Sequence, residues 1–66
     1  MQIQLNGELR EVPAGLDVPG LLAHLGLNPS RVAIERNLVI LPRAQWKGTV
    51  VTAGDRFEIV HFVGGG

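Results

Sequence analysis

The sequence predicts an α+β domain in which one face of a β-sheet is covered by a single helix. Three observations support this prediction. The N-terminal segment alternates polar and apolar residues with a period of two, a later segment repeats leucine with a helical period, and short β-rich segments follow that helix. The 66 residues suffice for one domain and one hydrophobic core.

The composition limits what can stabilise this domain and what it can bind. The chain has no cysteine and only two histidines, which lie far apart in sequence, so we expect neither a disulfide nor a metal site. Six Lys and Arg residues balance six Asp and Glu residues, and nucleic-acid binding normally requires a basic excess. No apolar stretch approaches the roughly 20 residues of a membrane span. We therefore expect a cytoplasmic protein with neither nucleic acid nor membrane as a partner.

A β-hairpin is predicted at the N-terminus. Residues 2–5 alternate glutamine with an apolar residue, as expected for a strand with one buried face. The Asn-Gly pair that follows predicts a turn, because both residues tolerate positive φ. We expect a loop of residues 6–8, since this length places Leu9 opposite Leu5 on the buried face.

The best-defined element is a helix whose N-cap is Asp17. Gly26 suits the left-handed position that follows the last helical turn. One apolar stripe at positions i, i+3, i+4 and i+7 is expected to face the sheet, and it consists of Val18, Leu21, Leu22 and Leu25.

The second half of the chain predicts further short strands. Residues 31–35 and 38–41 are expected to be strands joined by a turn, and residues 43–46 form one helical turn. The last strand spans residues 56–63. Because side chains alternate along a strand, one face should carry Phe57, Ile59 and His61, and the other face Glu58, Val60 and Phe62.

No side chains form a recognisable catalytic group. Ser30 is the only serine and lies in a turn, without a base placed to activate it. His24 is interpreted as a surface residue on the helix flank, and His61 as a half-buried polar residue of the last strand. We therefore expect no catalytic residues and no metal ligands in this chain.

Two charged segments also have ordinary interpretations. Glu35 and Arg36 are read as a solvated pair at a strand end. The Gly54-Asp55 pair is too short for a phosphate-binding loop, which requires a lysine and a following helix.

Three glycines, Gly64, Gly65 and Gly66, follow the last strand. A frayed end is one interpretation of this segment. However, residues without a Cβ can pass through a narrow channel and bring the terminal carboxylate to another protein's active site. Because a carboxylate must be activated before it reacts as an electrophile, such a tail indicates ATP-dependent adenylation by a partner. We predict a domain of residues 1–63 and a flexible tail of residues 64–66.

Several segments along the whole chain form a recognisable set: Met1-Gln2-Ile3, Asn6-Gly7-Glu8, Leu21-Leu22, residues 32–37, Pro42-Arg43 with Trp46, Gly54-Asp55 and residues 58–66. Together they resemble the sulfur carriers of thiamine biosynthesis, a family of ubiquitin-like β-grasp proteins. The resemblance implies a mixed sheet of four to five strands covered by one main helix.

The resemblance also implies a function. Gly66 would be adenylated by an adenylyltransferase of the ubiquitin-activating type, which uses ATP and magnesium. Sulfur from a cysteine desulfurase or an equivalent donor would displace AMP to leave a thiocarboxylate, and thiazole synthase would take that sulfur. The carrier itself would bind no cofactor. Residues 64–66 would enter the partner's active site, and Val60, Phe62 and Val63 would form the docking surface.

Other functions stay open at this point. A terminal Gly-Gly also fits the molybdopterin-synthase small subunit and a ubiquitin-like protein modifier. A β-grasp interaction module without an activated terminus is an alternative of a different class. Within the resemblance, the spacing of five residues in the central segment favours the thiamine carrier, and these residues are Glu35, Asn37, Pro42, Arg43 and Trp46.

Overall fold

The computed structural model describes residues 1–62. The proposed boundary between a domain of residues 1–63 and a tail of residues 64–66 lies outside this part of the chain. The strands are β1 (Gln2–Leu5), β2 (Glu8–Glu11), β3 (Val32–Arg36), β4 (Val39–Ile40) and β5 (Arg56–His61). The helical elements are α1 (Val18–His24) and two 3-10 turns, η1 (Pro29–Arg31) and η2 (Arg43–Gln45).

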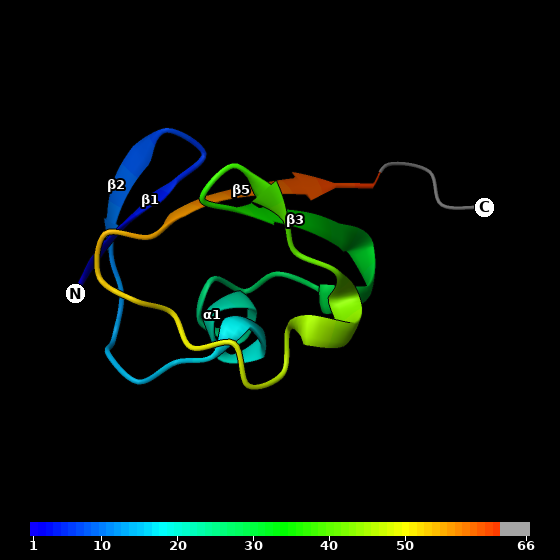
Figure 1. Cartoon of the computed structure of the whole chain (residues 1–66), viewed down its shortest axis with the longest axis horizontal. Helices are drawn as coiled ribbons and strands as arrows, with labels where there is room; N and C mark the ends of the chain where they lie inside the picture. The colour runs from blue at the N-terminus through cyan, green and yellow to red at the C-terminus, as the bar shows by residue number, and fades with distance from the viewer. Residues whose placement is uncertain (63–66) are drawn as a thin grey trace.

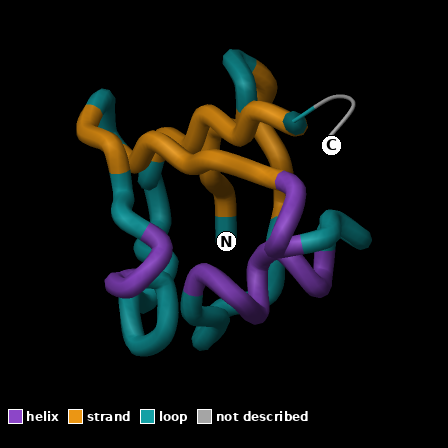
Figure 2. Tube along the Cα trace, turned by 90° about the vertical axis from the view of Figure 1, so that its right-hand side faces the viewer, coloured by secondary structure: helices purple, strands orange, loops and turns teal. Residues whose placement is uncertain are grey.

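The five strands form one mixed sheet in the order β2-β1-β5-β3-β4. β1 and β5 are parallel, and the other neighbouring pairs are antiparallel. α1 crosses beneath the sheet, and the strands and helices form two layers (Figures 1 and 2). This architecture confirms the predicted α+β class. It also places the C-terminal strand β5 at the centre of the sheet, with one face toward α1 and the opposite face free of any helix of residues 1–62.

The register of the β1-β2 hairpin differs from the prediction. The turn contains only Asn6 and Gly7, with φ values of 50° and 83°, and Leu5 pairs with Glu8. Leu9 therefore lies opposite Gln4 on the outer face and is 67% exposed. The expected three-residue loop is wrong because a two-residue turn with positive φ matches the twist of the strands. All of β2 is exposed at the sheet edge, so the register with a three-residue loop would not gain stability by burying Leu9.

The side chain of Asn6 has a second role beside the turn. Its Oδ1 accepts a hydrogen bond from the Ile59 backbone N–H (2.8 Å), and its Nδ2 donates to the Ile59 carbonyl oxygen (3.2 Å). The regular β1-β5 pairing reaches only Leu5 and Phe57. Asn6 thus extends the contact between the hairpin and β5 by one side chain.

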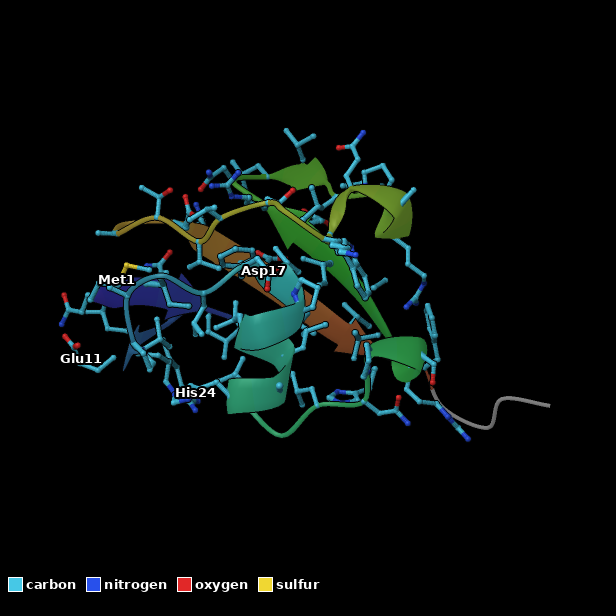
Figure 3. All side chains as sticks on the ribbon, turned by 90° about the horizontal axis from the view of Figure 1, so that it is seen from below. Met1, Glu11, Asp17 and His24 are labelled. Carbon is cyan, nitrogen blue, oxygen red and sulfur yellow. The ribbon has the colours of Figure 1, made fainter. Side chains whose placement is uncertain are left out.

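α1 has both of the predicted ends. The Asp17 carboxylate accepts a hydrogen bond from the Gly20 N–H (2.9 Å) and caps the first turn. At the other end Gly26 has φ of +73°, and the Leu27 N–H donates to the Leu22 carbonyl oxygen (2.9 Å), which closes the helix. Figure 3 shows Asp17 and His24 at opposite ends of this helix.

The core lies between α1 and the inner face of the sheet. It contains Ile3, Leu5, Val12, Val18, Leu21, Leu22, Val32, Ile34, Trp46, Val51, Phe57 and Ile59. The three inner strands, β1, β3 and β5, contribute alternate side chains to this core, and the edge strands β2 and β4 contribute none. Within residues 1–62, no helix has the length and apolar character needed to cross a membrane.

Candidate functional site

β5 is the element that leads to the glycine segment. Its register is held from both sides, by β1 and by five residue pairs with β3. After the strand, the Phe62 backbone N–H donates to the Arg31 carbonyl oxygen (2.8 Å). The chain therefore leaves the sheet from a fixed position at Phe62. The segment proposed to react, residues 64–66, and Val63 follow this position and lie outside the described residues.

The outer face of β5 is apolar at this end. Phe57 and Ile59 are buried against α1, so the alternate residues Val60 and Phe62 point away from the core. Val60 is 61% exposed and Phe62 is 52% exposed. The predicted orientation of these two side chains is confirmed, and their role in docking stays a prediction.

Further side chains from neighbouring strands complete this surface. On β3, Ala33 lies opposite Val60, and Ile40 of β4 lies opposite Glu35. The small Ala33 side chain leaves a shallow hollow between larger neighbours. We call this surface the outer-face patch, and it comprises Ala33, Glu35, Ile40, Glu58, Val60 and Phe62.

A buried carboxylate stabilises the start of β5. Asp55 Oδ2 accepts hydrogen bonds from Arg36 Nε (3.1 Å), Arg36 Nη2 (2.9 Å) and the Thr52 backbone N–H (2.8 Å). Its Oδ1 accepts from Asn37 Nδ2 (3.3 Å). Asn37, with φ of 52°, also binds the backbone N–H and carbonyl oxygen of Arg56. These residues, the Asp55 cluster, tie the end of β3 to the beginning of β5.

Burial by itself raises the pKa of Asp55, but the hydrogen bonds from Thr52, Arg36 and Asn37 and the charge of Arg36 outweigh it, so the pKa lies below its ordinary value. The sequence interpretation missed this role and read Arg36 as part of a solvated pair. Its partner lies 19 residues away. A usable signal was that Asp55 comes two residues before the inward-facing Phe57, a spacing that places both side chains on the buried side.

We expect Asp55→Asn to lower the free energy of unfolding at pH 7 by about 2–3 kcal/mol, because an amide cannot accept all the hydrogen bonds of the carboxylate. Because the pKa of Asp55 is lower in the folded state than in the unfolded state, its ionisation stabilises the fold at pH values above the unfolded-state pKa of about 3.9. This stabilisation is lost as the pH falls through the folded-state pKa. The difference between wild type and variant should thus shrink in strong acid.

Urea unfolding at pH 7 and well below pH 4 measures this difference. Glu8→Gln is the control, because Glu8 is exposed and forms no ion pair among residues 1–62. An Asp55→Asn variant as stable as Glu8→Gln at pH 7 would show that the Asp55 cluster does not stabilise the fold.

Arg43 and Trp46, two residues of the recognised central segment, support the fold. The Arg43 guanidinium lies 4.3 Å from the centre of the Trp46 ring and donates to the carbonyl oxygens of Pro29 and Val32. The Trp46 indole N–H donates to the Leu41 carbonyl oxygen (3.0 Å). These contacts attach η2 to the start of β3.

The other candidate side chains do not assemble into a catalytic site. Ser30 Oγ donates to Asn28 Oδ1 (2.8 Å), a local turn contact. His24 lies exposed at the end of α1, as predicted. His61 is exposed, and its half-buried interpretation is wrong because the buried part of β5 ends at Ile59. Residues 1–62 contain no cluster of three or more His, Cys, Asp or Glu side chains able to hold a metal ion.

A mixed five-stranded sheet with one covering helix places this protein among the ubiquitin-like β-grasp proteins. A profile of the ThiS family matches residues 3–66, nearly the whole chain. The chain belongs to the ThiS family, whose members are small sulfur carrier proteins.

Individual relatives agree with this assignment. The sulfur carrier protein ThiS of Escherichia coli is 33% identical over 66 residues, which span 100% of both chains. The crystal structure of a thiamine biosynthesis protein (ThiS) from Geobacter metallireducens superposes with a TM-score of 0.84 at 33% identity, over 100% of both chains. A thiazole synthase of Magnetococcus marinus is 44% identical over 66 residues. This chain spans only 20% of that protein's length.

Proposed function

We propose that this chain carries sulfur for thiazole formation in thiamine biosynthesis. The observation that supports this function is the end-to-end similarity to a sulfur carrier of equal length. We assign the reactive group to the carboxylate of Gly66. Only glycines stand between Val63 and this carboxylate, and residues without a Cβ can pass through a narrow channel in a partner enzyme.

The chemistry begins at the Gly66 carboxylate. One of its oxygens attacks the α-phosphorus of ATP in a partner adenylyltransferase, pyrophosphate leaves, and an acyl-adenylate forms. Magnesium bound with ATP offsets the phosphate charge. The terminal sulfur of a persulfide, supplied by a cysteine desulfurase or an equivalent donor, then attacks the acyl carbon and displaces AMP. A second thiol cleaves the resulting acyl disulfide, which leaves a thiocarboxylate on Gly66.

Thiazole synthase is the proposed acceptor of this sulfur. Thiazole synthases of Magnetococcus marinus and Paramagnetospirillum magneticum each contain a region 44% identical to this chain. A domain that shares a polypeptide with the synthase is expected to work beside it. This supports thiazole synthase as a partner, and the adenylyltransferase and sulfur donor follow from the chemistry of activation.

Intact mass spectrometry tests the proposed function. The protein ending at Gly66 is incubated with the adenylyltransferase from the same organism, ATP, magnesium and a persulfide donor. We expect an adenylyl adduct first, followed by a species heavier than the starting protein by the difference between sulfur and oxygen. If the protein never gains the sulfur mass with these enzymes, the proposed function is wrong.

The outer-face patch gives a second prediction. Phe62→Ser should weaken binding to the adenylyltransferase, because Phe62 is an exposed apolar side chain beside the segment that must enter the enzyme. The free energy of unfolding should change by less than about 1 kcal/mol, since the side chain is not in the core.

Leu9→Ser is the matched control, because Leu9 is an exposed apolar residue on the same face of the sheet but in the edge strand β2, away from Phe62. Isothermal calorimetry and urea unfolding of both variants provide the comparison. Equal affinities for the two variants would remove Phe62 from the docking surface. A loss of about 3 kcal/mol of stability in Phe62→Ser would instead indicate a core role.

A further inference from the structure

β2 is an edge of the sheet, and no strand of residues 1–62 pairs with its outward side (Figure 1). In an antiparallel pair, residues that bond to each other alternate with residues whose backbone groups point away. Met1 and Val12 form a bonded pair: the Val12 N–H donates to the Met1 carbonyl oxygen (2.9 Å), and the Met1 ammonium donates to the Val12 carbonyl oxygen (2.7 Å). Alternation from this pair directs the backbone N–H and C=O groups of Leu9 and Glu11 toward the open edge.

The charges of β2 restrict how this edge can pair with a second copy of itself. Charged side chains usually protect an edge strand from such pairing. Two identical antiparallel strands are related by a two-fold axis, and here the axis must pass through a residue, because outward-directed backbone groups have to face each other. An axis at Glu8, Arg10 or Glu11 places two like charges directly opposite each other, which destabilises the pair. Of the four residues of β2, only Leu9 can lie on the axis without this repulsion.

The register with Leu9 on the axis brings opposite charges together. Glu8 of each chain then lies opposite Arg10 of the other chain. Glu8 is on the inner face of the sheet, because it lies opposite the buried Leu5. Arg10 is on the same face, opposite the buried Ile3. Neither charged side chain forms an ion pair within residues 1–62. Two cross-strand ion pairs can therefore form on the inner face, one on each side of the axis.

Leu9 adds an apolar contact on the outer face. It is 67% exposed in the single chain. In this register the two Leu9 side chains are neighbours across the axis, and the two Leu9 backbones can exchange N–H to C=O hydrogen bonds. The contact is small, because β2 has only four residues, and interfaces below about 1,200 Å² are typical of weak, transient complexes. We therefore expect a dimer that forms only at high protein concentration.

We propose that β2 pairs with β2 of a second copy of this chain, antiparallel and with Leu9 on the two-fold axis, to form a weak dimer with one continuous sheet. In the order β2-β1-β5-β3-β4, β1 separates β2 from the strands that carry the outer-face patch. The dimer therefore leaves this patch uncovered. Pairing through β2 does not depend on sulfur transfer, which intact mass spectrometry tests separately.

Charge-swap variants test this register by analytical ultracentrifugation from micromolar to millimolar concentration. Glu8→Arg places like charges opposite Arg10 of the second copy, and Arg10→Glu places like charges opposite Glu8. Each variant alone should raise the dimer Kd about tenfold or more. An equal mixture of the two variants should dimerise with a Kd close to that of the wild type, because opposite charges again face each other in both pairs. The double variant Glu8→Arg/Arg10→Glu should do so by itself.

Ile40→Ser is the matched control, because Ile40 is an exposed apolar residue of β4, the other edge of the sheet. It should leave the dimer Kd unchanged. Wild-type protein that stays monomeric up to millimolar concentration would overturn the proposal. So would a wild-type dimer that Ile40→Ser dissociates, or one that forms while the mixture of charge-swap variants and the double variant both stay monomeric.

Discussion

Deletion of Gly66 is expected to abolish both the adenylyl and the sulfur mass shifts. The deletion moves the terminal carboxylate back by one residue, about 3.3–3.6 Å of extended chain. Reacting atoms must approach to about 3–3.5 Å, and a misplacement of 1 Å can reduce a rate about a hundredfold. The shortened chain still ends in glycine, so the experiment tests the reach of the tail rather than the chemistry of its last residue.

The deletion should leave the fold intact, because the buried core of the described residues ends at Ile59. Urea unfolding of the shortened protein therefore provides the control, and its midpoint should match that of the wild type. Adenylation of the shortened chain at the wild-type rate would show that the position of the carboxylate is not restricted to Gly66. An altered midpoint would indicate that the last residue contributes to the domain.

Phe57→Ala should lower the free energy of unfolding by about 3–5 kcal/mol, the range for a fully buried phenylalanine. Phe57 is completely buried at the centre of the sheet. Since small domains have a total stability of about 5–15 kcal/mol, this single change is expected to leave a marginal fold. The proposed sulfur-carrier function should then be lost as well, because β5 positions the segment that leads to Gly66.

Phe62→Ala is the matched control for this prediction, since it is the same substitution five residues after Phe57, at an exposed position just beyond the end of β5. It should cost less than about 1 kcal/mol. Urea unfolding curves of the two variants measure the difference directly. Similar losses in both would mean that the assignment of inner and outer faces along β5 is wrong.

Local sequence patterns were sufficient for much of this protein. The alternation in β5 assigned Val60 and Phe62 to the outer face, because a strand places successive side chains on opposite sides regardless of its neighbours. The leucine stripe, Asp17 and Gly26 predicted α1 with both ends, since caps and helical periods involve residues within one or two turns. The role proposed for residues 64–66 rests on the sequence and on the family resemblance.

What the tertiary structure decided are the contacts between segments distant in sequence. The pairing of Asp55 with Arg36 and the opposition of Glu35 and Glu58 depend on which strands become neighbours and in which register. A period of two says which side chains share a face of one strand, but it leaves the alignment of two strands open, and a shift of one residue reverses the faces. The position of Leu9 was mispredicted for this reason. The backbone geometry of the turn determines the register of β2. Because all of β2 is exposed at the sheet edge, burial of a side chain does not favour the other register.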